Sequence, residues 1–118
     1  MELTEQELAE RFKAWIENAE LSIETVQVKL ANGKMKVLMM NVGIPIYILQ
    51  EFKMVGSYAV LNGRLKFQLE EFAPDAPWAW VIAPTADEVM AGMTKDIQVT
   101  EVKIADGKMI VSGLKVSS

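Results

Sequence analysis

The spacing of apolar residues changes near position 20, from a helical interval to strict alternation. Before that point, apolar side chains recur every three or four positions, at Leu8, Phe12, Trp15, Ile16 and Ala19. Thr4 is followed three residues later by Glu7, and such a pair can satisfy two free backbone N–H groups at a helix start. The pattern predicts an amphipathic helix over residues 5–19.

A second helix is predicted at residues 84–93. Pro84 suits the first turn of a helix, and Asp87 and Glu88 favour its positive end. Outside the two helical segments the apolar residues mostly alternate with polar ones, which is the period of a β-strand.

Three dipeptides that favour tight turns interrupt the alternating runs: Asn32-Gly33, Asn62-Gly63 and Asp106-Gly107. A type I′ turn requires positive φ at both central residues, and these dipeptides meet that requirement at low cost. Each is followed by a basic residue. The sequence therefore predicts three β-hairpins with two-residue loops.

A two-residue loop also fixes which residues lie opposite each other. The predicted pairs are apolar on one face of each hairpin: Leu30 with Met35, Val28 with Val37, Val26 with Met39, Val60 with Leu65, Tyr58 with Phe67, Gly56 with Leu69, Ile104 with Met109 and Val102 with Val111. A slip of one residue would turn every one of these sets outward, so turn chemistry and patterning support the same register.

The chain is expected to be a single domain, residues 1–118, with an internal repeat. Val28–Met35 aligns with Val102–Met109, and a predicted helix precedes each copy, so that the helix-hairpin units span about 5–40 and 84–116. Both copies lose their alternation upstream, after Ile23 and after Val99. We expect a β-bulge at each of these places, which bends and twists a strand.

The segment Val42–Phe52 is apolar on both faces and contains Pro45, which cannot donate to a strand ladder. We interpret it as a kinked continuation of the second strand. Both of its faces would need cover from a helix, a second subunit or a ligand. Together the elements predict an α+β fold: a curved antiparallel sheet of about six strands on two helices, in the order α-β-β-β-β-α-β-β.

The amino-acid composition excludes several classes of function. The 118 residues are 51% hydrophobic and 24% charged, and they include neither cysteine nor histidine. This excludes thiol and imidazole catalysis, disulfides and Cys/His metal sites, and no catalytic spacing of carboxylates, lysines or tyrosines is present. We expect a protein that is not an enzyme and that uses no cofactor or metal.

The net charge of −4 equals the net charge of residues 1–20 alone, which contain six glutamates and two basic residues. Without a basic excess, nucleic acid is not an expected partner. Met1 is followed at once by Glu2 and a helix start, so no signal peptide or anchor is expected within this sequence. A cytosolic protein and a soluble domain separated from an anchor both fit, and the localisation stays open.

Four features follow one another along the chain: the acidic Thr4-x-x-Glu7 helix start, the Asn-Gly and Asp-Gly hairpins followed by a basic residue, the helix beginning near Pro84 and the closing hairpin Val102–Val116. Together they resemble the LmeA-like phospholipid-binding proteins, a family related to tubular lipid-binding domains. The resemblance covers most of the chain. It implies a long curved sheet wrapped about helices, lipid held in an apolar groove, no catalysis and a place in the bacterial cell envelope.

The residues expected to contact such a ligand combine inward-facing sheet positions with the two tryptophans of the proline-rich segment. They are Met35, Val37, Met39, Met54, Tyr58, Phe67, Leu69, Trp78, Trp80 and Met109. Methionine adapts to irregular apolar partners but also fills ordinary cores, and both interpretations stay open. The tryptophans could plug one end of the sheet, touch a membrane, gate a ligand or contact a subunit.

Basic residues cluster near the turns, at Lys29, Lys34, Lys36, Arg64, Lys66, Lys103 and Lys108. They would form a positive rim for anionic headgroups if the turns lay together, or they serve solubility and protect strand edges. The leading hypothesis is non-enzymatic binding of a lipid or another apolar molecule in a groove between the sheet and the helices, with peripheral membrane contact as a compatible role. The alternative is a homo-oligomeric interaction module without a ligand, such as a homodimer.

Overall fold

The structure is a computed structural model that describes residues 1–44, 47–73 and 84–116. Its elements are β1 (Glu2–Thr4), α1 (Glu5–Asn18), β2 (Thr25–Ala31), β3 (Lys34–Ile44), β4 (Tyr47–Leu61), β5 (Arg64–Ala73), α2 (Thr85–Met93), β6 (Ile97–Ala105) and β7 (Lys108–Lys115). The α+β class and the predicted order of elements are confirmed. One strand was not foreseen: β1 is only three residues long and ends where the helix cap begins.

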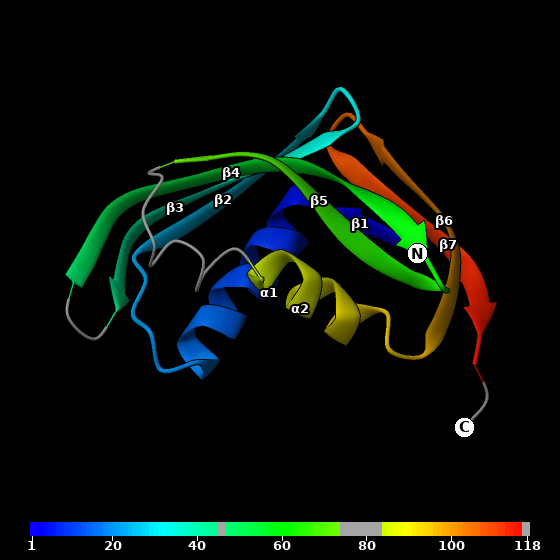
Figure 1. Ribbon diagram of the computed structural model, residues 1–118, viewed down its shortest axis with the longest axis horizontal. Helices are drawn as coiled ribbons and strands as arrows, with labels where there is room; N and C mark the ends of the chain where they lie inside the picture. The colour runs from blue at the N-terminus through cyan, green and yellow to red at the C-terminus, as the bar shows by residue number, and fades with distance from the viewer. Residues whose placement is uncertain (45–46, 74–83, 117–118) are drawn as a thin grey trace.

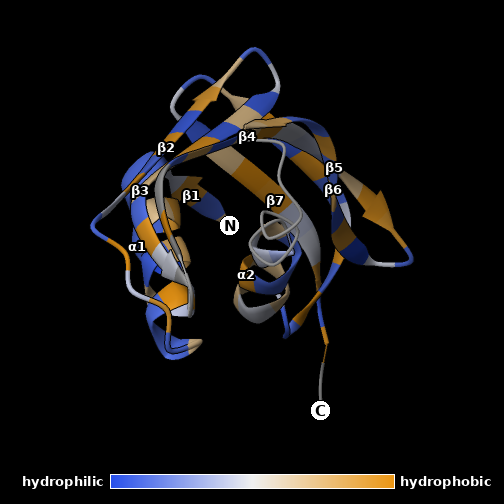
Figure 2. Cartoon of the chain, turned by 60° about the vertical axis from the view of Figure 1, so that its left-hand side comes forward, coloured by the Kyte–Doolittle hydropathy of each residue, from blue (hydrophilic) through white to orange (hydrophobic). Residues whose placement is uncertain are grey.

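The strands form two antiparallel sheets, in the orders β2-β3-β4-β5 and β1-β7-β6. In Figure 1 the long strands β3 and β4 arch over the two helices, and the sheet with β6 and β7 descends on the other side. Figure 2 shows the hydrophobic positions of α1 turned toward the space between the helices and the strands. The helices therefore occupy the concave side of the curved sheets.

The first helix forms as its sequence predicts. The hydroxyl of Thr4 accepts a hydrogen bond from the backbone N–H of Glu7 at 3.1 Å, and the Glu7 carboxylate accepts one from the N–H of Thr4 at 3.3 Å. Along α1, Leu8, Phe12 and Ile16 are fully buried. Their spacing places one apolar stripe against the strands and leaves the charged residues in solvent.

All eight predicted cross-strand pairs are present in the observed register. Asn32, Gly33, Asn62 and Gly63 have positive φ, as a type I′ turn requires. The third turn differs from the expectation, because there Gly107 has positive φ and Asp106 does not. The side chain of Asp106 instead accepts a hydrogen bond from the backbone N–H of Asn32 at 3.4 Å.

The tips of the first and third hairpins lie side by side. In addition to the Asn32–Asp106 contact, the N–H of Gly107 donates to the carbonyl oxygen of Leu30 at 2.8 Å. Asn32 and Asp106 are equivalent positions of the sequence repeat, so the two copies touch at matching points. The second hairpin tip contacts the other end of β6, where the N–H of Val99 donates to the carbonyl oxygen of Gly63 at 2.8 Å.

The two expected bulges have different outcomes. A register shift between Val99 and Glu101 confirms the bulge in the second copy. In the first copy the prediction was wrong, because Ser22 bridges Gly43 in the same register in which Thr25 pairs with Met40. The ladder is interrupted there without an extra residue. The lost alternation therefore reflects a break in pairing, not a bulge.

The interpretation of Val42–Phe52 as a kinked continuation was also wrong. Strand β3 ends at Ile44, β4 begins at Tyr47, and these two residues pair in an antiparallel ladder. The segment is a fourth hairpin that carries none of the Asn-Gly or Asp-Gly signal by which the other three were found. Its residues 45 and 46 lie outside the described residues.

Candidate binding site

Eight of the predicted ligand residues lie within the described residues, and all of them face the core. Five are completely buried, Tyr58 and Phe67 are 8% exposed, and Leu69 is partly buried. The fully buried ones are Met35, Val37, Met39, Met54 and Met109. The inward orientation is as predicted. Trp78 and Trp80 lie outside the described residues, and a ligand-binding role for any of the ten stays a prediction.

These residues share one hydrophobic cluster with the buried faces of α1 and α2, to which α2 contributes Val89 and Met90. Methionine supplies five of the eleven largest fully buried side chains: Met35, Met39, Met54, Met90 and Met109. Because methionine is unbranched and flexible, it packs irregular spaces and can repack around a guest. The core between the sheet and the helices is therefore closed in this structure but built from adaptable side chains.

Gly56, which pairs with Leu69, leaves no space for a ligand. It lies at a register shift in β4, and a Cβ atom placed on it would meet the Phe67 ring at 2.6 Å and the carbonyl oxygen of Gln68 at 2.3 Å. The ring of Phe67 also contacts that of Tyr58, with their centroids 5.1 Å apart. The absence of a side chain at Gly56 thus makes room for the ring of Phe67, which occupies the space beside the glycine.

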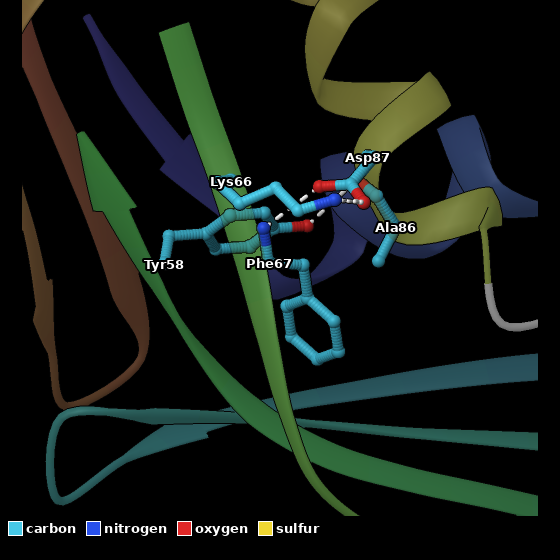
Figure 3. Close-up of polar contacts among 5 residues, drawn as sticks. All are labelled: Tyr58, Lys66, Phe67, Ala86 and Asp87. Carbon is cyan, nitrogen blue, oxygen red and sulfur yellow. Dashed lines mark hydrogen bonds and ion pairs between the residues drawn. The ribbon is translucent and has the colours of Figure 1, made fainter. Parts of the chain in front are cut away.

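A polar cluster anchors the start of α2 to strands β4 and β5 (Figure 3). The hydroxyl of Tyr58 donates to the carbonyl oxygen of Ala86 at 2.9 Å, and the Asp87 carboxylate accepts from the backbone N–H of Phe67 at 2.7 Å. The same carboxylate forms an ion pair with Lys66 at 3.1 Å. Because β5 is an edge strand, Asp87 satisfies an N–H that no neighbouring strand can reach.

Burial raises the pKa of Tyr58 well above its ordinary value of 10.0, and the nearby negative charge of Asp87 raises it further. The phenol is therefore neutral across the physiological range and remains a hydrogen-bond donor to Ala86. A buried phenol fixed in this way has a structural role. Its hydroxyl holds α2 against β4 through the carbonyl oxygen of Ala86.

Beside this cluster, a groove of about 480 Å³ runs along the junction of α2 with β5. Its lining mixes apolar and charged residues: Leu61, Asn62, Arg64, Leu65, Lys66, Pro84, Asp87, Glu88, Ala91 and Thr94. Leu61 is 59% exposed there. Among the described residues no carboxylate lies within ion-pair distance of Arg64, whereas Lys66 is paired with Asp87.

The sequence did not identify this groove, apart from the basic character of Arg64 and Lys66. Leu61 and Leu65 belong to the hairpin around Asn62-Gly63, and Ala91 belongs to α2, so the groove depends on how those elements pack. An exposed leucine next to a hairpin turn is the one signal that could have pointed to it.

The basic residues near the turns do not form a single rim. Lys34 pairs with Glu70 at 3.0 Å, and Lys108 pairs with Glu2 at 3.6 Å. The first and third hairpin tips meet at one end of β6, whereas the second tip, with Arg64 and Lys66, lies at the other end. Any anion would therefore meet two separate basic regions.

Within residues 1–44, 47–73 and 84–116, no cluster of acidic side chains is arranged to hold a metal ion. Neither helix in that part of the chain has the length and apolar character needed to cross a membrane. Comparison of the chain with protein-family models, with curated proteins and with solved structures gave no match.

Proposed function

We propose that this protein is a non-catalytic binding domain that holds a lipid or a similar anionic amphiphile in the groove between β5 and α2. The observation that carries the proposal is the composition of that groove: an exposed leucine and a guanidinium without an ion-pair partner lie beside a methionine-rich core. An amphiphile with one apolar chain and one anionic group matches both parts.

The apolar part of the ligand would lie on Leu61, Leu65 and Ala91. Covering exposed apolar surface is favourable by roughly 25 cal/mol per Å², so even a short alkyl chain gains from this contact. A longer chain would have to enter between α2 and the sheet. Met54 and Met90 are buried in the core there, and their flexibility favours repacking around a guest.

The anionic part of the ligand would pair with Arg64. A guanidinium binds carboxylate or phosphate oxygens through two parallel hydrogen bonds, and this one has no competing carboxylate within ion-pair distance among the described residues. A lipid is also the ligand class that the resemblance to the LmeA-like proteins implies. The residues predicted from the sequence, such as Met35 and Met39, would then form the inner wall reached only when α2 moves.

Native mass spectrometry of gently purified protein separates the two leading hypotheses. Extra mass in lipid-sized steps supports the proposal. A bare doubled mass supports the homo-oligomeric module, and a bare monomer counts against both.

A titration with dansyl-labelled undecanoic acid tests the location of the site. Ala91→Trp should fill the groove and abolish the fluorescence change, whereas Ala14→Trp, the same substitution at an exposed position of α1, should bind as the parent protein does. Arg64→Gln should weaken binding, and Lys103→Gln, an exposed basic residue outside the groove, should not. Unchanged binding by Ala91→Trp would place the ligand elsewhere.

A further inference from the structure

A second groove lies on the opposite edge of the four-stranded sheet, at β2. It has a volume of about 500 Å³ and follows four consecutive residues of that strand, from Val26 to Lys29. One wall is formed by Gln6 and Ala9 of α1, and the other by Lys36 and Leu38 of β3. The groove therefore wraps around a strand edge, from the concave side to the convex side.

The backbone of β2 offers free hydrogen-bonding groups in this groove. Leu30 lies opposite Met35, and its N–H and carbonyl point away from β3, toward Glu5 at 2.7 Å and Gly107 at 2.8 Å. Since backbone groups alternate along a strand, Val28 and Val26 point their N–H and carbonyl groups the same way. Within the described part of the chain, these four groups have no hydrogen-bond partner.

The positive charge in the groove is not neutralised by an ion pair within the described residues, because the carboxylate of Glu5, which also lines the groove, accepts from the N–H of Leu30. Lys29 and Lys36 lie directly opposite each other in the β2–β3 ladder, and neither has a carboxylate within ion-pair distance among the described residues. Like charges placed directly across a ladder repel. Other lysines of the same sheet are paired, such as Lys34 with Glu70 and Lys53 with Glu71. A negative group supplied from outside would relieve this repulsion.

The geometry points to β2 as a docking site for an extended acidic peptide of another protein, added to the sheet as a further strand. Its backbone would pair with Val26 and Val28, and its acidic side chains would lie on the convex face beside Lys29. Alternate residues would face Ala9 on the concave side, so small apolar side chains fit there. The preferred ligand thus alternates acidic and small apolar residues.

The charge argues against a second copy of this chain as the occupant. Pairing two β2 strands edge to edge would bring two sets of Lys29 and Lys36 to one continuous face and would increase the repulsion. The docking segment is also short, because Glu5 and Gly107 already occupy the groups of Leu30 and close the groove there. This inference concerns a different edge of the sheet from the lipid groove and does not depend on it.

The test uses a labelled hexapeptide of alternating glutamate and valine, with binding followed by fluorescence anisotropy and by amide hydrogen exchange. The exchange of the Val26 and Val28 amides should slow when the peptide is added, whereas the amides of Gln27 and Lys29, which already face β3, should not change. If neither the Val26 amide nor the Val28 amide is protected, the proposal is overturned. The proposal is also overturned if the protein without peptide has twice the mass of one chain, since that indicates a second copy on the β2 edge.

Variants and altered peptides distinguish strand addition from charge attraction alone. Lys29→Glu should weaken binding about fivefold. Lys103→Glu, at the equivalent position of the sequence repeat, should leave it unchanged. The same hexapeptide N-methylated at every residue keeps its charge but has no N–H group to donate to β2 from either of its edges. If it binds as tightly as the parent peptide, strand addition is wrong, and this result does not depend on the folding of any variant.

Discussion

Each edge strand of the four-stranded sheet donates one backbone N–H to the first turn of a helix, but the two helices are held in different ways. Glu5, the first residue of α1, accepts a hydrogen bond from the N–H of Leu30 in β2 at 2.7 Å. Asp87, in the first turn of α2, accepts one from the N–H of Phe67 in β5 at 2.7 Å. Both carboxylates also lie where a helix dipole favours negative charge.

The difference lies in what else holds each helix. The long helix α1 buries Leu8, Phe12 and Ile16, so its apolar stripe dominates its attachment. The shorter helix α2 adds the Tyr58–Ala86 hydrogen bond and the Lys66–Asp87 ion pair to a smaller apolar face. We infer that α1 is held mainly by its apolar stripe, whereas α2 depends more on directional polar contacts, and under the proposed function α2 is the helix that would move.

The largest effect is expected from Phe12→Ala in α1. Removal of a fully buried ring leaves a cavity, and the free energy of unfolding should fall by about 4 kcal/mol. Urea denaturation followed by circular dichroism measures the loss, with Ala14→Ser at an exposed position of the same helix as the control. A loss below about 1 kcal/mol would mean that α1 is not held by its apolar stripe.

Asp87→Ala should cost about 2 kcal/mol, because it leaves the Phe67 N–H without its acceptor and removes the Lys66 ion pair. Glu5→Ala removes a single acceptor and should cost about 1 kcal/mol. Glu88→Ala, an exposed acidic neighbour, is the control. Denaturation of the three variants compares the two caps directly, and the proposed contrast fails if Glu5→Ala costs as much as Asp87→Ala.

Tyr58→Phe should cost about 1 kcal/mol at neutral pH through loss of the hydrogen bond to Ala86. Its main signature is in alkali. Because the folded-state pKa is raised, the contribution of Tyr58 is fully present below pH 10, the ordinary pKa, and falls as the pH rises beyond it, when the unfolded chain ionises first. Stability of the parent protein relative to Tyr58→Phe should therefore decline above pH 10. A constant difference across that range would show that the phenol is not buried as described.

Lys66→Gln should have the smallest effect, no more than about 0.5 kcal/mol, because the lysine end of its ion pair with Asp87 is exposed to solvent. Thermal unfolding at low and high salt measures it, and salt should reduce the parent's advantage. A loss as large as that of Asp87→Ala would assign the attachment of α2 to the ion pair, not to the Phe67 N–H.

The sequence predicts local structure here better than it predicts contacts between elements. The capping box at Thr4 and the three glycine-centred turns are short-range features, and each specified its element and register correctly. The hairpin between β3 and β4 was missed because Pro45 and its neighbours carry no such turn signal. Its apolar residues on both faces looked equally compatible with one long strand.

The candidate sites depend on long-range packing, which explains why they were not predicted. Asp87 was expected only to favour a helix end, and nothing near it in the sequence indicates that its carboxylate meets Phe67. The inward face of the sheet was predicted correctly, including Met35 and Met54. Packing of the two helices against that face was also predicted, but alternation shows which face is apolar and does not show how closely it is covered.

The three-stranded sheet has a consequence for biosynthesis. Its central strand, β7, pairs with β1 on one side and β6 on the other, so residues near opposite ends of the sequence must meet: Leu3 lies opposite Met109. During translation, β1 and the helix attached to it emerge long before their partner exists. The arch of β2 to β5 can form before β7 exists, but β1 must wait for β7, so the three-stranded sheet closes after the arch.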